Sequence, residues 1–334
     1  MSESKTTKQS AEPAMPEVSQ KTGPILEVQG LTKYFDAAKG KKVHAVENVS
    51  FTLERGETLG IVGESGCGKS SMGRTILKIH DSTSGKIIFD GVDITKFSNK
   101  QMNPYRKRMQ MIFQDPYASL NPRMTVGEII EEPMVIHNMG TPKERKAIVQ
   151  DLIQTVGLKP DHIRRYPFEF SGGQRQRIGL ARALAVEPRL IVCDECTSAL
   201  DVSVQAQILN LLKEIQCATS VAYLFITHDL SVVGYLADRV AVMYLGHLVE
   251  EGSAEEIFAH PAHPYTKALF AAAPRLQGRE QAVPRQLSGD VPSPIHPPTG
   301  CPFHPRCPHA TPQCAAEFPG WRNVGKWHRV RCMG

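Results

Sequence analysis

Residues 63–70 of this chain read Gly63-Glu64-Ser65-Gly66-Cys67-Gly68-Lys69-Ser70. They match the phosphate-binding loop G-x-x-x-x-G-K-[ST] at every fixed position. The apolar run at 58–62 predicts a buried strand before the loop, and residues 71–79 predict a helix after it. Glycines allow backbone N–H groups to close around phosphate oxygens, and a helix N-terminus adds partial positive charge. An ordinary glycine-rich turn is the alternative, but the strand–loop–helix context favours a nucleotide site.

Two side chains of this loop can contact phosphate or metal directly. Lys69 can reach the terminal phosphates, and the Ser70 hydroxyl can join the shell of a Mg²⁺ ion. The loop backbone surrounds the remaining phosphate oxygens. The complete predicted phosphate site comprises Gly63, Glu64, Ser65, Gly66, Cys67, Gly68, Lys69, Ser70 and Ser71.

Length and composition limit the class of protein. The 334 residues suit two domains, or one large domain with an appendage. The net charge of +5 is mild and the basic residues are scattered, so we expect no nucleic-acid partner. No apolar run approaches the ~20 residues that a membrane span requires. Residues 1–23 are polar and predict a disordered tail rather than a signal peptide, so we expect a cytoplasmic chain.

The order of patterns along the chain predicts an α/β fold. Alternating residues at 25–53 predict antiparallel strands, and later apolar strands alternate with helices, which is typical of a mostly parallel sheet. A helical pattern fills an insertion at about 115–187. After residue 260 the composition shifts towards Pro, His and Cys. We therefore predict a tail at 1–23, a nucleotide-binding domain at 24–260 and a small cysteine-rich region at 261–334.

Two further motifs add chemistry to the phosphate loop. Asp194 and Glu195 follow an apolar strand, where the first carboxylate can hold Mg²⁺ through water and the second can polarise an attacking water. Many apolar strands end in acidic residues, so this pair alone is weak evidence. The run Ser171-Gly172-Gly173-Gln174 opens a helix and offers free N–H groups to a second anion. Its alternative interpretation is a simple helix cap.

Six motifs in order resemble the nucleotide-binding subunit of an ABC transporter, over about residue 25 to the C-terminus. They are the phosphate loop, Gln114 after a strand, Ser171-Gly172-Gly173-Gln174, Asp194-Glu195, Ser198-Ala199-Leu200-Asp201 and Thr227-His228-Asp229. Three longer runs, at 117–123, 201–207 and 263–266, are similar to the dipeptide and oligopeptide importer branch, which also includes nickel transporters. The resemblance implies the ABC nucleotide-binding fold, with an antiparallel β subdomain and a helical subdomain.

The resemblance assigns roles to single residues. Lys69 and the loop hold the β- and γ-phosphates of ATP, while Ser70, Asp194 and Gln114 serve Mg²⁺. Glu195 acts as general base or orients the attacking water, and His228 contacts the γ-phosphate. The aromatic side chain that stacks on adenine is Phe35 or, as the less favoured choice, Tyr34, and core packing of Phe35 is equally open. The residues expected to face the ATP bound by a partner subunit are Ser171, Gly172, Gly173 and Gln174, and Asp201 is also expected at the nucleotide.

Two positions depart from the family pattern. Cys196 stands where proline is usual, and Phe168 stands where histidine is common. Neither change removes a group that contacts phosphate or serves the metal, so we expect a subunit that hydrolyses ATP. Both residues could change the geometry of the loops in which they lie and the rate of ATP hydrolysis.

The eight cysteines fall into two groups. In a cytoplasmic chain they are more typical of metal ligands or buried thiols than of disulfides. We expect buried thiols at Cys67, Cys193, Cys196 and Cys217.

The other four, Cys301-x5-Cys307-x6-Cys314-x17-Cys332, can stabilise a segment too short to build its own core. They lack the tight C-x₂₋₄-C pair usual in zinc sites, whereas [4Fe–4S] clusters accept wider spacings. The resemblance also implies an iron–sulfur cluster. That cluster is favoured, while zinc or no metal stay open, and His304, His309 and His328 are possible substitute ligands.

The leading functional prediction is an ATPase subunit that powers an importer of di- or oligopeptides, or of a related solute such as glutathione or chelated nickel. The resemblance implies two permease subunits, an extracytoplasmic binding protein and a paralogous ATPase, with a heterodimer favoured over a homodimer. It places the chain at the cytoplasmic face of a bacterial inner membrane. The alternatives are a soluble ABC-type ATPase acting on nucleic acid or ribosomes, and a regulatory module with a vestigial ATPase.

Overall fold

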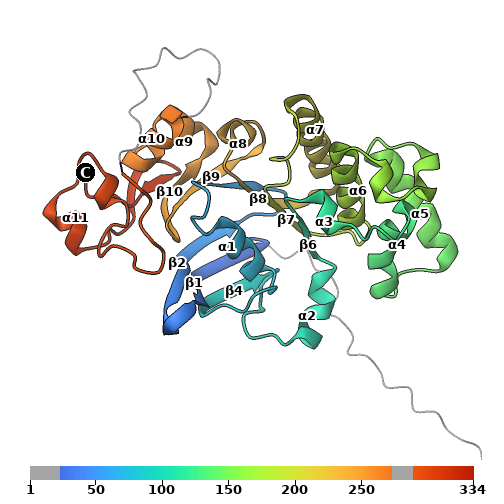
Figure 1. The fold of residues 1–334 in the computed structure, drawn as a ribbon, viewed down its shortest axis with the longest axis horizontal. Helices are drawn as coiled ribbons and strands as arrows, with labels where there is room; N and C mark the ends of the chain where they lie inside the picture. The colour runs from blue at the N-terminus through green and yellow to red at the C-terminus, as the bar shows by residue number, and fades with distance from the viewer. Residues whose placement is uncertain (1–22, 273–288) are drawn as a thin grey trace, which may run out of the picture.

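Two β-sheets and the helices around them form the protein in the computed structural model, which describes residues 23–272 and 289–334 (Figure 1). The predicted disordered tail at 1–23 lies, apart from residue 23, outside the described residues. One sheet has four strands in the order β2-β1-β4-β5, and the other has eight in the order β11-β12-β10-β9-β3-β8-β7-β6. This arrangement confirms the predicted α/β fold.

The eight-stranded sheet has a parallel centre in which β3 is flanked by β9 and β8, followed by β7 and β6. Every residue of β3, β7 and β8 is buried. Parallel strands covered on both faces are apolar throughout, which explains why these runs are visible in the sequence. The strands are β3 Thr58–Val62, β6 Met109–Ile112, β7 Leu190–Asp194, β8 Ala222–Thr227, β9 Arg239–Tyr244 and β10 His247–Ser253.

Helices cover the two faces of this sheet. Helix α1 packs on one face together with the small antiparallel sheet, through Met72 and Ile76. Helices α6 (Gly172–Leu184) and α7 pack on the other face, for example through Ile178 and Leu212. The elements are α1 Lys69–Ile76, α7 Val202–Thr219, α8 Leu230–Leu236 and, in the small sheet, β1 Leu26–Asp36, β2 Lys42–Leu53, β4 Ser84–Phe89 and β5 Val92–Asp93. Connecting elements are η1 Ala38–Gly40 and α2 Asn99–Arg106.

One predicted buried thiol is wrong: Cys217 is exposed. The buried stripe of α7 includes Ile208, Leu211, Leu212 and Ile215, which recur with the helical period. Cys217 lies two residues beyond Ile215 and therefore on the opposite side of the helix. Cys67, Cys193 and Cys196 are buried as predicted.

The helical subdomain lies at one end of the molecule (Figure 1). Three of its helices begin at capping boxes in which Thr125, Thr141 and Ser171 accept from the backbone three residues later. Such boxes satisfy N–H groups that the first helical turn leaves free. The elements are α3 Pro116–Ser119, α4 Val126–Ile136, α5 Pro142–Thr155, η2 Pro160–Arg164, η3 Pro167–Glu169 and α6 Gly172–Leu184.

The cysteine-rich region lies at the opposite end and continues the main sheet (Figure 1). Strand β12 pairs antiparallel with β10, and the buried His328 Nε2 lies 2.7 Å from Glu250 Oε1. The last part of the chain is therefore joined to the domain that precedes it. The elements are α9 Ala254–Ala259, α10 Pro264–Ala272, η4 His304–Arg306, α11 Pro312–Ala316, β11 Arg322–Gly325 and β12 His328–Val330.

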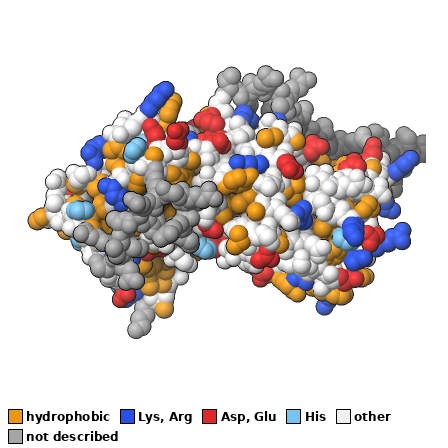
Figure 2. Space-filling model, turned by 90° about the horizontal axis from the view of Figure 1, so that it is seen from above, with side chains coloured by type: hydrophobic (Ala, Val, Ile, Leu, Met, Phe, Trp, Pro, Cys, Tyr) orange, Lys and Arg blue, Asp and Glu red, His pale blue; other side chains and the backbone are white. Residues whose placement is uncertain are grey.

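The surface carries charges of both signs. On the face shown in Figure 2, Lys and Arg side chains are interspersed with Asp and Glu side chains over the described residues. Among the helices of residues 23–272 and 289–334, none is both long and apolar enough to cross a bilayer.

Candidate functional site

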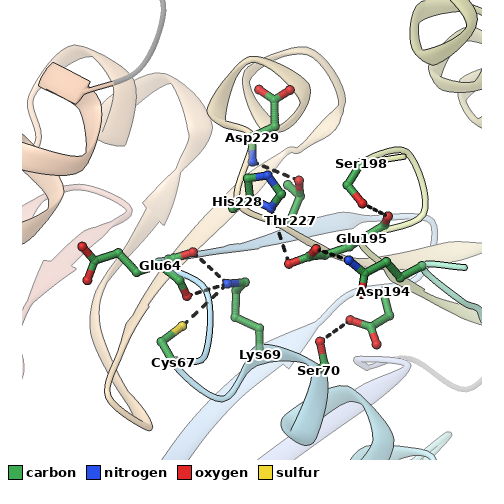
Figure 3. A network of polar contacts seen from close by, with 12 residues as sticks. Glu64, Cys67, Lys69, Ser70, Asp194, Glu195, Ser198, Thr227, His228 and Asp229 are labelled. Carbon is green, nitrogen blue, oxygen red and sulfur yellow. Dashed lines mark hydrogen bonds and ion pairs between the residues drawn. The ribbon is translucent and has the colours of Figure 1, made fainter. Parts of the chain in front are cut away.

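The candidate site lies at the carboxyl ends of the central parallel strands. The phosphate loop leaves β3, Asp194 ends β7 and Thr227 ends β8. Parallel register brings these ends to one edge of the sheet, where ligands bind in open α/β folds. Figure 3 shows the side chains from all three strands around this edge.

Close packing holds the two ends of the phosphate loop. A Cβ on Gly63 would lie 2.1 Å from the Met243 carbonyl oxygen, and one on Gly68 would lie 1.9 Å from that of Ala45. Gly68 also has a φ of +107°, which L side chains rarely adopt. Only glycine fits at either position. The exposed residues Ser65 and Gly66 form the open part of the loop between them.

Lys69 points into the loop rather than to solvent. It is 4% exposed, and its Nζ donates to the carbonyl oxygens of Gly63 at 2.7 Å and Glu64 at 2.9 Å (Figure 3). Burial raises the pKa of the neighbouring Cys67 thiol. Cys67 therefore stays a neutral thiol and adds no negative charge beside the Lys69 ammonium.

Ser70 and Asp194 are adjacent, as the metal role requires. Ser70 Oγ donates to Asp194 Oδ1 at 2.5 Å, and Arg74 Nη2 lies 3.4 Å from Oδ2. Asp194 is 1% exposed. A carboxylate and a hydroxyl oxygen, side by side at the start of α1, are the hard donors that Mg²⁺ takes beside phosphates. The residues present therefore fit this ion.

Glu195 is held between two of the other predicted residues. Gln114 Nε2 donates to Glu195 Oε2 at 2.9 Å, and His228 Nδ1 lies 3.5 Å from Oε1. The backbone of Glu195 has a φ of +48°, a conformation that costs a non-glycine residue about 1–3 kcal/mol. Its N–H donates to Ile226 O, and its carbonyl accepts from Ser198 Oγ. Three residues distant in sequence thus meet at one carboxylate.

The two departures from the family pattern lie outside these contacts. Cys196 is buried in the core on the helical side of the sheet. Phe168 is 65% exposed, and its ring stacks on Tyr166 with centroids 5.7 Å apart.

The two aromatic candidates for adenine differ in their surroundings. The Tyr34 hydroxyl donates to the Glu47 carboxylate, and the ring centroids of Tyr34 and His44 lie 4.2 Å apart. Phe35 is half-buried; its ring is perpendicular to that of His80, with centroids 5.3 Å apart, and Lys33 Nζ lies 4.7 Å from its centroid.

The segment Ser171 to Gln174 lies on another part of the molecule from the phosphate loop. Ser171 caps α6, which packs on the face of the sheet opposite α1. Asp201 caps α7 by accepting from Val204 N at 3.0 Å. Within one chain, these residues serve as helix caps.

The four C-terminal cysteines line a single cavity of about 440 Å³, together with His263, His304 and His309. Burial raises the pKa of the Cys301 thiol to about 11, while a hydrogen bond with Thr311 lowers that of Cys314. Within the described ranges, no three His, Cys, Asp or Glu side chains form a group that could hold a metal ion. His328 bonds to Glu250 instead of facing this cavity.

Two residues that the sequence analysis missed contact the phosphate loop. Arg306 donates to both carboxylate oxygens of Glu64, from Nη1 at 2.8 Å and Nη2 at 3.2 Å. The Glu64 N–H donates to the Tyr265 hydroxyl at 2.8 Å. The Arg306–Glu64 contact joins residues 242 positions apart, so no local pattern could reveal it.

Comparison with known proteins agrees with this geometry. Residues 46–198 match the family described as ABC transporter, and residues 249–314 match that described as oligopeptide/dipeptide transporter, C-terminal region. The chain is 50% identical to the oligopeptide transport ATP-binding protein AppF of Bacillus subtilis, over 92% of this chain and 96% of that protein. It is 49% identical to the putative oligopeptide transport ATP-binding protein YkfD of Bacillus subtilis, over 92% and 95%.

Solved structures show the same fold. The ATP-binding cassette MJ0796, a dimer in a post-hydrolysis state bound to ADP and Pi, matches with a TM-score of 0.63 and 27% identity. The match covers 69% of this chain and 98% of that one. The site geometry and these relatives together show that the chain belongs to the oligopeptide/dipeptide branch of the ABC transporter ATP-binding proteins, a family of ATPases.

Proposed function

We propose that this chain hydrolyses ATP at the described sheet edge to power import of di- or oligopeptides through permease subunits. The observation that carries the proposal is the meeting of Gln114, Glu195 and His228 beside the Ser70–Asp194 pair. The named relatives are oligopeptide transport proteins, which supports the peptide class. They give no support to the nucleic-acid alternative.

Binding comes first in this mechanism. Lys69 moves from the loop carbonyls to the β- and γ-phosphates, and the loop N–H groups surround them. Ser70 and Asp194, with Gln114, would hold Mg²⁺, which would neutralise charge on the phosphates. Phe35 supplies the ring for adenine, because Tyr34 is already engaged with Glu47 and His44.

Hydrolysis then depends on Glu195. Its carboxylate orients the attacking water and takes up a proton from it, while Gln114 and His228 hold its two oxygens in place. His228 is exposed enough to contact the γ-phosphate and to respond when that group leaves.

Two chains complete each site in this proposal. Ser171 to Gln174 lie at the start of α6, on the face of the sheet opposite α1, so we assign them, together with Asp201, to the nucleotide of a partner ATPase. ATP then adds contacts that exist only in the closed dimer, and its hydrolysis removes them. We favour a paralogous partner, two permeases at the inner membrane and an extracytoplasmic binding protein.

The test uses the intact transporter purified with its native partners. Glu195→Gln should retain ATP binding while losing turnover and peptide uptake, whereas Glu255→Gln, exposed on α9, should behave as the wild type. Mass spectrometry of the same preparation should identify two permeases and a second ATPase. Recovery of ribosomes or nucleic acid alone would contradict transport.

We also propose that the four-cysteine cavity holds a [4Fe–4S] cluster. Its support is the placement of Cys301, Cys307, Cys314 and Cys332 around one cavity, although they are not gathered tightly enough to hold a single ion. A cluster separates its four thiolate ligands more widely than one zinc ion does. Anaerobically purified protein should be brown and contain iron and acid-labile sulfide. Stoichiometric zinc without iron would contradict the cluster.

A further inference from the structure

Arg306 connects the cysteine-rich region to the phosphate loop. It lies in η4, between Cys301 and Cys307 in sequence, and its side chain is 6% exposed. Its guanidinium makes a two-point contact with the carboxylate of Glu64, the second residue of the loop. Bidentate contacts of this kind fix orientation as well as charge.

The position of Glu64 makes this contact significant. A carboxylate within a loop that receives a polyphosphate repels the ligand, because like charges at short range oppose binding. Figure 3 shows the Glu64 carboxylate directed away from Lys69, while the carbonyl of the same residue faces the Lys69 ammonium. Arg306 is the partner that holds the carboxylate in this direction.

The surroundings favour a fixed pair. The fully buried Tyr265 accepts from the Glu64 N–H, and its ring lies 4.7 Å from that of Tyr244. The Tyr244 hydroxyl lies 3.4 Å from Arg306 Nη1. Because Arg306 is almost excluded from water, loss of the Glu64 carboxylate would leave the guanidinium poorly compensated.

We propose that Arg306 is a positioning residue of the nucleotide site. It neutralises Glu64 and keeps its carboxylate away from the phosphates, so the cysteine-rich region contributes to ATP affinity. Its guanidinium acts through Glu64 and not by touching the nucleotide.

The experiment measures the Kd of a fluorescent ATP analogue on the full-length chain, with a melting temperature for each variant. Arg306→Ala should weaken binding roughly tenfold, because it frees a negative charge beside the phosphates. Adding Glu64→Gln to that variant should recover most of the loss. Arg306→Lys, which keeps the charge but loses the two-point contact, should weaken binding less than Arg306→Ala does.

Arg329→Ala is the matched control. Arg329 also joins the C-terminal region to the core, through Glu251 Oε2 at 2.6 Å, but it lies on β12 and not at the phosphate loop. The Arg329→Ala variant should have a lower melting temperature than the wild type but the same Kd for the ATP analogue. Lys69→Ala, which removes the phosphate ligand, should abolish binding and thereby tests the site itself.

Two results would overturn the proposal. One is a folded Arg306→Ala variant that binds the analogue as tightly as the wild type. The other is an Arg306→Ala, Glu64→Gln double variant that binds no better than Arg306→Ala, since a purely structural role of the pair predicts that outcome. If Lys69→Ala bound normally, the nucleotide site would be wrong, and that result is distinct from failure at Arg306.

Discussion

The nucleotide edge and the cysteine-rich region position their side chains by different means. At the nucleotide edge, Ser70, Asp194 and Thr227 come from the ends of parallel strands or the helix start beside them, so sheet register places them together. The cysteine-rich region has short elements, and its links to the core include Arg306 to Glu64, His328 to Glu250 and Arg329 to Glu251. The ends of parallel strands fix one site, whereas the pairing of β12 with β10, the burial of Phe303 and these ion pairs together hold the other region in place.

The largest expected effect tests the nucleotide edge. Glu195→Gln should lower ATP turnover by about 10²–10⁴-fold, because the amide cannot take up a proton from water. ATP binding and the closed dimer should persist, as measured by nucleotide retention and size-exclusion chromatography. Unchanged turnover would remove Glu195 from the base role.

A second substitution tests the cavity lined by the four C-terminal cysteines. If the cavity holds the proposed [4Fe–4S] cluster, Cys301→Ser should release iron and destabilise the protein by about 2–4 kcal/mol, because a bound metal group stabilises the fold that carries its ligands. Iron content and chemical denaturation measure both effects. Cys217→Ser, at the exposed cysteine of α7, is the control and should change neither. Full iron content in Cys301→Ser would exclude that thiol as a ligand.

The pH dependence of stability tests two histidines that lie in or near the cysteine-rich region. Burial lowers the pKa of His247, which packs against Phe318, to about 4, and lowers that of His263 to about 4 as well. Unfolded histidine has a pKa of about 6.5, so below that pH the unfolded chain binds protons that the folded chain does not. The free energy of unfolding should therefore fall between about pH 6.5 and pH 4, by on the order of 3 kcal/mol for each of the two histidines.

Substitution at His247 checks the origin of this slope. His247→Gln should flatten the dependence of unfolding free energy on pH, as followed by urea denaturation at several pH values. His260→Gln changes an exposed histidine and should leave the slope as it is. An equal slope in both variants would show that His247 is not responsible.

The smallest effect separates a helix cap from a nucleotide contact. Ser171→Ala and Thr125→Ala each remove a capping box and should each cost about 1 kcal/mol of stability. Only Ser171→Ala should also reduce ATPase activity of the assembled transporter, because we place Ser171 at the nucleotide of the partner subunit. Equal activity of the two variants would leave Ser171 as a cap alone.

Local patterns predicted much of this protein because the phosphate loop and its flanking elements are encoded in consecutive residues. The buried parallel strands were visible as apolar runs, and the capping box at Ser171 follows from residues three apart. Cys217 was misplaced although its spacing from the apolar stripe that includes Ile215 indicates the exposed side of α7. Arg306 was missed because a single arginine in the Pro-, His- and Cys-rich segment has no distinctive signature.

The sequence by itself determined the fold class, the phosphate loop and the types of side chain available for ATP chemistry, since spacing along the chain specifies these directly. The tertiary structure decided which of them meet. Gln114 and His228 reach Glu195 only because three strands end at one edge, and Arg306 reaches Glu64 only because the C-terminal region folds back onto the loop. Such contacts depend on how side chains are directed by packing across many residues, and no short segment carries that information.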